Sequence, residues 1–288
     1  MKAKPHADCI PIYQVDAFTE KRFKGNPAVV CILDKELPES LMQLIATEMN
    51  LSETAFVKPL ENKPIREVKT YCLRWFTPLV EVSLCGHATL ATAAVLFDEV
   101  KILRERIVFK TRSGNLLAKR AVNGTSLFFP KDEPEEIAPE KALIRTLGIR
   151  NFGGTFYGRR TQMLLIELRG EKDVRDVRPD YEAMKLANTK ENIKGVIITA
   201  VGTAPYDFVS RFFGPWVGIN EDPVTGSAHT LLTPYWAKKL GKTEMLAQQA
   251  STRGGELVVK LEPMDKVNLV GKTAMVLKGT LYVQSVDN

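Results

Sequence analysis

The chain has 288 residues, of which 44% are hydrophobic and 26% are charged. This composition is typical of a globular protein with one large domain or two of about 140 residues, and it excludes collagen-like and wholly disordered chains. The 40 basic and 34 acidic side chains leave a formal net charge of +6. Because no nucleic-acid-binding motif accompanies this charge, we expect no nucleic-acid partner.

Membrane insertion and secretion are not expected either. No apolar run approaches the roughly 18 residues that span a bilayer, and the first residues lack the apolar core of a signal peptide. The four cysteines are far apart and form no C-x-x-C pair. Reduced thiols and a cytoplasmic location are therefore expected.

Three helices are predicted in chain order. The first runs from Pro38 to about Met49, and the second is the alanine-rich apolar run 87–97. The third covers 227–242, with Ser227 as a plausible N-cap and Gly241 at the stop, and Pro234 should kink it or mark a tolerated first-turn break. Short β-branched runs predict strands at 28–33, 107–110, 196–201, 256–261 and 274–283. The acidic, proline-containing segment 131–141 is expected to be a surface connection near a domain boundary.

The two halves of the chain repeat each other. Arg74-Trp-Phe-Thr-Pro78 returns as Arg211-Phe-Phe-Gly-Pro215, and Leu84-Cys-Gly-His-Ala88 returns as Val224-Thr-Gly-Ser-Ala228. A third match, of Arg112-Ser-Gly-Asn-Leu116 with Arg253-Gly-Gly-Glu-Leu257, keeps the same order. The repeat predicts an α+β protein of two similar domains related by a pseudo-twofold axis, residues 1–129 and 130–288, each a sheet wrapped on an apolar helix. The last strand could return to the first domain.

The repeated glycine turns are the first candidate site. Each opens a helix, and a helix N-terminus presents unpaired N–H groups that bind carboxylates or phosphates. If the two domains face each other, both turns point into one cleft between them; otherwise they are ordinary helix starts. Histidine suits proton transfer near neutral pH. Residues able to bind substrate or move protons here are Cys85, Gly86 and His87 in the first turn and Asp222, Thr225, Gly226, Ser227 and His229 in the second.

Glu53 is a further candidate for acid–base chemistry. Strand alternation places it on the same face as Leu51, Ala55 and Val57. If that face is in the core, its pKa should rise and it could hold or deliver a proton. If the face of Phe56 is buried instead, Glu53 is a surface residue, and spacing alone does not decide.

Other common sites are not predicted. The chain has no P-loop, no G-x-G-x-x-G after a strand, no G-x-S-x-G and no H-E-x-x-H motif. Neither a nucleotide nor a metal is therefore indicated.

Five ordered motifs together resemble the PhzF family of phenazine biosynthesis-like proteins. They are Asp16-Ala-Phe with Gly25-Asn-Pro27, Asn50-Leu-Ser-Glu-Thr-Ala-Phe56, Arg74-Trp-Phe-Thr-Pro78, Cys85-Gly-His-Ala-Thr89 and Glu221-Asp-Pro-Val-Thr-Gly-Ser-Ala-His229. The resemblance covers residues from about 12 to 283. It implies the diaminopimelate epimerase-like fold with an active site between two domains, and it implies homodimerisation.

The resemblance also implies isomerase chemistry without metal or organic cofactor. In the phenazine enzyme a glutamate moves a proton along a dihydro-hydroxyanthranilate, and its counterpart by motif is Glu53. The family's site histidine, aspartate and serine fall on His87, Asp222 and Ser227. In related epimerases two cysteines exchange a proton across an α-carbon, but here Cys85 is matched by Thr225, whose hydroxyl is too weak an acid or base for that role.

The leading hypothesis is a proton-moving isomerase of a small carboxylate-bearing metabolite. Glu53 would shuttle the proton, His87 and Asp222 would be polar partners, and Cys85, Gly86, Thr225, Gly226 and Ser227 would contact the substrate. Two alternatives stay open. One is a protein-binding or regulatory protein with a vestigial cleft, and the other is an epimerase that depends on Cys85.

Overall fold

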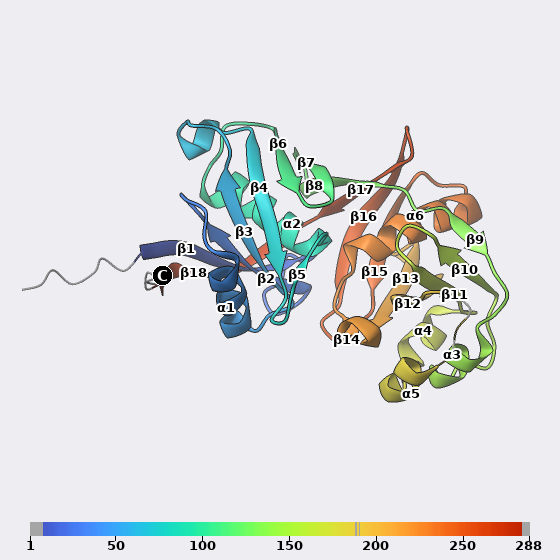
Figure 1. The fold of residues 1–288 in the computed structure, drawn as a ribbon. Coiled ribbons are helices and arrows are strands. Elements are labelled where there is room, and N and C mark those ends of the chain that lie inside the picture. Colours follow the sequence, from blue (N-terminus) through green and yellow to red (C-terminus); the bar gives the residue numbers. More distant parts are fainter. Residues whose placement is uncertain (1–7, 188, 190, 284–288) are drawn as a thin grey trace, which may run out of the picture. The chain divides into compact units, whose positions relative to one another are not determined.

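The computed structural model describes residues 8–187, 189 and 191–283. The chain divides into two compact units (Figure 1). The first unit contains residues 8–23, 27–127 and 272–283, and the second contains residues 24–26 and 128–271. Within these described ranges, no helix is long and apolar enough to cross a membrane.

The first unit is a mixed sheet. Its strands are β1 (Asp8–Ala17), β2 (Asn26–Ile32) from Pro27 on, β3 (Glu53–Pro59), β4 (Thr70–Phe76), β5 (Glu81–Val82), β6 (Arg106–Thr111), β7 (Gly114–Ala121), the first part of β8 (Gly124–Pro130) and β18 (Thr273–Val283). β2 runs parallel to β3, β3 antiparallel to β4, and β4 parallel to β6. β18 is antiparallel to β1, so the last strand belongs to the first unit.

Two helices cover opposite faces of this sheet. α1 (Glu39–Met49) shares an apolar cluster with Phe56 of β3 and Phe76 of β4. α2 (Gly86–Ala94) contacts β1, β3 and β18, and every residue after Gly86 is buried. It continues into a π-turn, Val95–Glu99. Because side chains alternate along a strand, Phe56 faces α1 while Glu53, Ala55 and Val57 face α2. Both faces of β3 are buried at this end, which is why spacing alone did not orient Glu53.

The second unit repeats this arrangement. Its strands are β9 (Pro134–Glu136), β10 (Gly154–Gly158), β11 (Met163–Glu167), β12 (Gly195–Val201), β13 (Phe208–Gly214), β14 (Ile219–Asp222), β15 (Glu244–Gln249), β16 (Gly255–Glu262) and β17 (Lys266–Gly271). β11 is parallel to β12, β12 antiparallel to β13, and β13 parallel to β15. These are the orientations of β2, β3, β4 and β6, so the repeat in the sequence is a repeat in connectivity.

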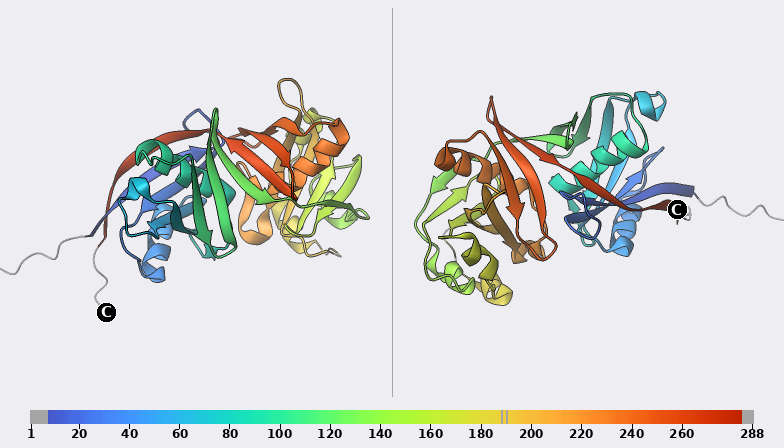
Figure 2. Two further views of the ribbon diagram at one scale, coloured as in Figure 1. Left: turned by 90° about the horizontal axis from the view of Figure 1, so that it is seen from above. Right: turned by 180° about the vertical axis from the view of Figure 1, so that it is seen from behind.

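The helices of the second unit also lie on both faces of its sheet. α3 (Lys141–Thr146), α4 (Glu171–Asp176) and α5 (Tyr181–Leu186) pack on one face. α6 (Gly226–Leu240) contacts β9, β16 and β17, and Figure 2 shows it in orange beside β16 and β17.

Two sequence expectations for this unit need correction. Thr225, not Ser227, is the N-cap of α6, because the helix begins two residues earlier than a cap at Ser227 implies, at Gly226. Segment 131–141 is not only a surface connection, because it contains β9 and the buried Asp132. The Asp132 carboxylate accepts hydrogen bonds from the backbone N–H groups of Arg160 and Thr161.

Pro234 lies inside α6, which continues through it to Leu240. A proline lacks the N–H that would bond the carbonyl four residues earlier. Here that carbonyl, of Thr230, accepts instead from the backbone N–H of Asp132, at 3.2 Å. α6 therefore tolerates Pro234 because the backbone N–H of Asp132 bonds the carbonyl that the proline cannot reach.

Candidate active site

Glu53 begins β3 and is buried. It is paired in register with Ala28 of β2 and is only 7% exposed. An ionisable side chain in such a place requires polar partners, because burying an unpaired charge is costly. The partners come from the start of α2, the helix that covers this face of the sheet.

The first turn places Cys85 and His87 at the N-terminus of α2. Cys85 is the extended N-cap residue, and Gly86 is the first helical residue. His87 is buried in the first helical turn. The hydroxyl of Thr89 donates to the carbonyl of Cys85 at 2.5 Å, which fixes the N-cap to the first turn of the helix.

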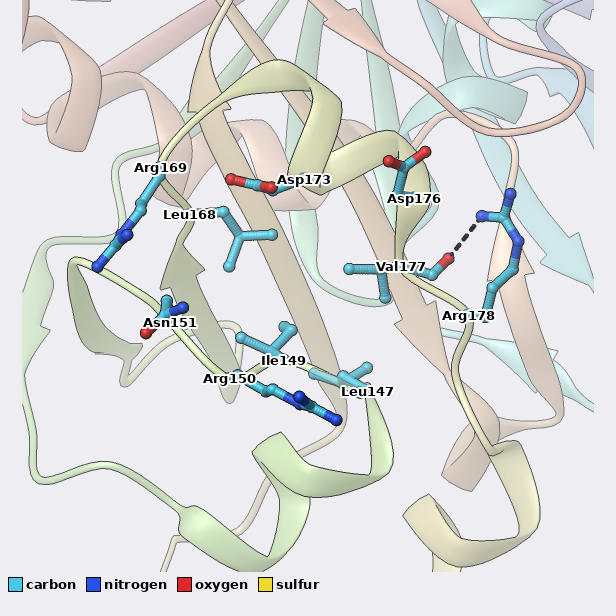
Figure 3. Close-up of a pocket in the computed structure, with 11 residues that line it drawn as sticks. Leu147, Ile149, Arg150, Asn151, Leu168, Arg169, Asp173, Asp176, Val177 and Arg178 are labelled. Atoms are coloured by element: carbon cyan, nitrogen blue, oxygen red, sulfur yellow. Dashed lines mark hydrogen bonds between the residues drawn. The ribbon is translucent and has the colours of Figure 1, made fainter.

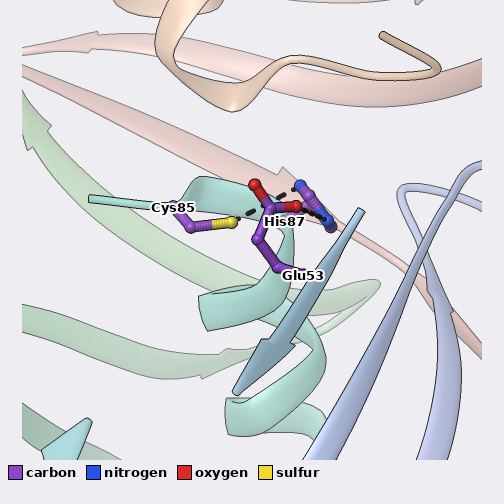
Figure 4. Close-up of side chains that lie close together, drawn as sticks. All are labelled: Glu53, Cys85 and His87. Atoms are coloured by element: carbon purple, nitrogen blue, oxygen red, sulfur yellow. Dashed lines mark hydrogen bonds and ion pairs between the residues drawn. The ribbon is translucent and has the colours of Figure 1, made fainter. Parts of the chain in front are cut away.

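Glu53, Cys85 and His87 form one cluster (Figure 4). The Nε2 atom of His87 lies 3.0 Å from Oε2 of Glu53, and its Nδ1 atom lies 3.6 Å from Sγ of Cys85. Neither Oε2 of Glu53 nor Nε2 of His87 has an aligned hydrogen-bond partner among the described residues. The imidazole therefore stands between a carboxylate and a thiol, with polar atoms left available.

The electrostatics favour a protonated imidazole. Burial opposes protonation of His87, but Cys85 and Glu53 favour it, and the balance raises the pKa of His87 well above its ordinary value. Burial and the nearby Glu53 raise the pKa of the Cys85 thiol. The cluster therefore favours the protonated forms of both the imidazole and the thiol.

The second turn holds Asp222 and Thr225 in a buried hydrogen-bond network. The Asp222 carboxylate accepts from Nδ2 of Asn26 at 2.8 Å and from the Thr225 hydroxyl at 2.5 Å. The amide of Gln249 donates to the Asp222 carbonyl at 2.7 Å and accepts from the Thr225 backbone N–H at 2.8 Å. Asn26 also donates to the Val224 carbonyl. Through these hydrogen bonds Asp222 stabilises the conformation of the turn.

The other predicted residues of this turn lie at the start of α6. Gly226 is the first helical residue and is buried, and Ser227, the second, is half-buried. His229 is fully buried, and its Nδ1 donates to the carbonyl of Thr225 at 2.8 Å. Burial lowers the pKa of His229 to about 4, against the opposing effect of that hydrogen bond. His229 thus fixes the N-cap of α6, as Thr89 does in α2.

Arg74 and Arg211, which occupy matching positions of the repeat, each form an ion pair with a glutamate that precedes one of the turns. Arg74 makes a bidentate ion pair with Glu81, at 2.8 and 2.6 Å, and its guanidinium lies over the ring of Phe76. Arg211 pairs with Glu221 in the same way, at 2.7 and 3.0 Å, and lies over Phe213. The signal was present in the repeated Arg-x-Phe motif, but only the structure identifies the acidic partners.

The strand registers show where the two units differ. Phe56 pairs with Arg74 in the first unit and Ile198 pairs with Arg211 in the second, so Gly195 is the counterpart of Glu53. A Cβ atom at Gly195 would lie 2.3 Å from the ring of Phe212. The second unit therefore has no carboxylate at this position and no room for one.

A pocket of about 460 Å³ lies on the second unit, away from these residues along the chain (Figure 3). Its lining includes the exposed Arg150 and Arg169 and the apolar Leu147, Leu168 and Val177. None of the predicted site residues lines it. A second hollow of about 580 Å³ is bordered by Arg211 and Glu221. Neither contains an acid–base cluster comparable to that of Glu53, Cys85 and His87.

The structure thus brings three of the predicted residues together in the first unit and places Asp222, Thr225, Gly226 and Ser227 at the corresponding turn of the second. The prediction that the two turns share one cleft stays a prediction. Of the groups described, Glu53, Cys85 and His87 are also the set that could ligate a metal, with ligand atoms within 4.8 Å of one another.

Comparison with known proteins identifies close relatives. The family model of phenazine biosynthesis-like protein matches residues 15–279. The phenazine biosynthesis-like domain-containing protein of Rattus norvegicus is 44% identical over 284 residues, which cover 94% of this chain and 99% of the relative. A protein of Halalkalibacterium halodurans named as an uncharacterized isomerase is 46% identical over 277 residues, covering 95% and 98%.

Solved structures agree. The crystal structure of a PhzF-family phenazine biosynthesis protein from Enterococcus faecalis matches with a TM-score of 0.86 and 43% identity, over 96% of this chain and all of that one. At 11% identity, a hydroxyproline epimerase from Agrobacterium vitis shares the fold with a TM-score of 0.57. The epimerase-like fold class expected from the resemblance is confirmed.

Proposed function

Because the chain belongs to the family of phenazine biosynthesis-like proteins, we propose that it is an isomerase that moves a proton between two carbons of a small carboxylate-bearing metabolite. Its relatives support an isomerase-type activity in general terms. The proposal adds the acid–base group, Glu53, and a reaction that needs neither metal nor organic cofactor.

One observation carries the proposal: the buried carboxylate of Glu53 lies 3.0 Å from Nε2 of His87 at the N-terminus of α2. A carboxylate that is partly withdrawn from water and has an acid beside it is suited to accept and return a proton. The N–H groups at the start of α2 would stabilise negative charge that develops on the substrate.

The reaction can be written with the chain's own groups. The Glu53 carboxylate takes a proton from an activated C–H bond, and the electron pair of that bond moves into the conjugated system of the substrate. His87 and the start of α2 stabilise the resulting anion. The Glu53 carboxylic acid then returns the proton to a different carbon, so that substrate and product have the same atoms and Glu53 is regenerated.

The second unit favours a single base over two. An epimerase of the two-thiol kind needs an acid–base group on each side of the α-carbon, but Thr225 stands where the second thiol would be and Gly195 stands opposite Glu53 in the repeat. Asp222 as a polar partner, and Thr225, Gly226 and Ser227 as carboxylate-binding residues, belong to the same proposal, as do Cys85 and Gly86 in the first unit.

A second candidate is an epimerase that depends on Cys85, and the 3.6 Å contact between its thiol and His87 favours it. An imidazole can deprotonate a thiol, which would make Cys85 the base. Cys85 and Glu53 are therefore the two residues to compare.

Deuterium exchange tests both candidates. The full chain is incubated in D2O with a panel of small carboxylates that includes dihydro-hydroxyanthranilate, and incorporation is read by mass spectrometry. We expect Glu53→Gln to lower exchange at least about 1,000-fold, whereas Glu105→Gln, at an exposed glutamate, should leave it unchanged.

Cys85→Ser separates the two candidates in the same assay. A loss below about tenfold supports Glu53 as the base, while a loss as large as that of Glu53→Gln favours the epimerase. Absence of exchange with every compound would count against the isomerase and for a binding protein.

A further inference from the structure

We propose that Glu53, Cys85 and His87 form a binding site for Zn²⁺, and that the bound ion blocks the proton transfer described above. The binding site stands on the geometry alone. The inhibition rests on the proposed isomerase function, because it requires that Glu53 and His87 be the reacting groups.

The spacing of the thiol and the imidazole fits a tetrahedral zinc ion. Zinc bonds of about 2.3 Å to sulfur and about 2.0 Å to nitrogen, at a tetrahedral angle, separate the two ligand atoms by about 3.6 Å. Sγ of Cys85 and Nδ1 of His87 are 3.6 Å apart. One ion can therefore bind both atoms with little movement of either side chain.

Glu53 supplies the third ligand. The ligand atoms of the three residues all lie within 4.8 Å of one another, so the widest pair needs to close by about 1 Å to reach zinc-site spacing. Such a shift is within reach of rotations about the glutamate side-chain bonds. Three protein ligands of this kind leave the fourth position of zinc to water or to an added ligand.

Two polar atoms of the cluster point independently to a ligand. Oε2 of Glu53 and Nε2 of His87 are buried, in side chains only 10% and 7% exposed, and have no aligned hydrogen-bond partner among the described residues. Buried polar atoms are normally satisfied. An ion bound to Sγ of Cys85 and Nδ1 of His87 would draw the Glu53 carboxylate away from Nε2 and give it a ligand.

The donor set selects zinc over the common hard cations. Mg²⁺ and Ca²⁺ need six or more oxygen ligands, and this cluster offers one carboxylate. A thiolate with an imidazole is the combination that borderline and soft divalent ions prefer. Zn²⁺ binds as the thiol and the imidazolium release their protons to solvent, so the two anionic ligands balance its charge.

The amino-acid sequence does not indicate this site, because its ligands fit no metal-binding motif. Cys85 and His87 are two residues apart, and Glu53 comes from a strand 32 positions earlier in the chain. The second unit has Thr225 and Gly195 at the positions of Cys85 and Glu53, so we expect one ion per chain.

Metal titration of the purified, EDTA-treated and fully reduced full chain tests the proposal. Zn²⁺ is titrated in competition with a chromophoric chelator, and Co²⁺ serves as a spectroscopic probe, because a thiolate ligand gives it a charge-transfer band in the near ultraviolet. We expect one ion per chain and a Co²⁺ charge-transfer band.

Variants of the same chain locate the ion. Cys85→Ser should weaken Zn²⁺ binding at least about 100-fold and remove the Co²⁺ band, and Glu53→Gln should weaken binding at least about tenfold. The matched controls Cys72→Ser, at a half-buried thiol of β4, and Cys9→Ser, at an exposed thiol of β1, should leave both unchanged. Circular dichroism and a thermal melt check that each variant folds. If Cys85→Ser does not fold, Glu53→Gln is used to locate the ion.

The outcomes separate this proposal from the proposed function. Absence of binding, or binding that survives Cys85→Ser, overturns the zinc site whatever the isotope exchange shows. Binding that depends on Cys85, in a protein that exchanges deuterium into no compound, supports the site and overturns the inhibitory role. Exchange that Zn²⁺ stops in the unmodified chain but not in Cys85→Ser supports both.

Discussion

The turn at the start of α2 and the turn at the start of α6 share the same supporting contacts but carry different functional side chains. In each, an arginine clamps an acidic residue, a glycine opens the helix, and a side chain four residues after the N-cap bonds the N-cap carbonyl. The first turn places a thiol and an imidazole beside a buried glutamate, whereas the second has a carboxylate whose oxygens accept from Asn26 and Thr225.

The difference shows that the backbone arrangement of the turn can be kept while its acid–base side chains change. Duplicated strands and clamps preserve the position of a helix N-terminus, while single side chains decide whether acid–base groups are present there. Substitutions in both units, ordered by the largest effect expected in each comparison, test where the two turns are alike and where they differ.

The arginine clamps should differ in strength. Arg211→Ala is expected to lower the free energy of unfolding by about 4 kcal/mol, because it leaves the Glu221 carboxylate and the carbonyls of Val174 and Val177 without their donor in a buried site. Arg74→Ala should cost about 1–2 kcal/mol, since Arg112 still pairs with Glu81. Urea unfolding of both variants measures this, and equal losses would contradict the comparison.

The buried histidines should respond to pH in opposite directions. The pKa of His229 is lowered to about 4 by burial, so the unfolded chain binds a proton more readily. The folded chain therefore loses up to about 3 kcal/mol as pH falls from about 6.5 to 4. Urea unfolding across this range measures the slope. His229→Asn, which can still donate to the Thr225 carbonyl without titrating, should remove it, and an unchanged slope would refute the assignment.

His87 should show the reverse. Burial opposes its protonation, but Cys85 and Glu53 outweigh burial and raise its pKa above the ordinary value. Its contribution to stability is then fully present below the unfolded pKa of about 6.5 and is lost as pH rises through the folded pKa. The same unfolding series, continued to alkaline pH with His87→Asn beside the unmodified chain, detects this, and parallel curves would exclude it.

Equivalent positions in the two turns should differ in their effect on catalysis. If the proposed isomerase reaction holds, His87→Asn is expected to lower the rate of deuterium exchange at saturating substrate about 100-fold, the usual size of an acid–base contribution. Ser227→Ala should lower that rate less than about tenfold and act mainly on KM, because a hydrogen bond to a substrate carboxylate contributes to binding. A larger rate effect for Ser227 would reverse the assignment.

The last comparison concerns Gly195, the counterpart of Glu53 in the second unit. Gly195→Ala should destabilise the protein by about 2 kcal/mol, because the new Cβ atom meets the buried ring of Phe212. Gly279→Ala, at a strand glycine with open space around it, is the control and should be close to neutral. Thermal melts of both variants, and of Gly195→Ala combined with Phe212→Leu to relieve the clash, show whether the ring is the obstacle.

Much of this architecture could be read from local pattern. The repeat of Arg74-Trp-Phe-Thr-Pro78 in Arg211-Phe-Phe-Gly-Pro215 predicted two similar halves, and the apolar run after Gly86 predicted a buried helix. These features depend on neighbours along the chain, which period and propensity describe. The orientation of Glu53 could not be read in the same way, because a strand covered by helices on both faces shows no alternation of polar and apolar residues.

The sequence by itself determined the fold class and the matched turns, and it made Glu53, Cys85 and His87 candidates, since each rests on residues close together in the chain or on an ordered set of motifs. Only the tertiary structure decided that these three side chains meet, that Asn26 and Gln249 brace Asp222 and Thr225, and that Gly195 takes the place of a second glutamate. The reason is physical: hydrogen bonds, ion pairs and close packing act over a few ångströms in space. Strand pairing and the packing of helices on the sheets bring residues dozens or hundreds of positions apart within that reach.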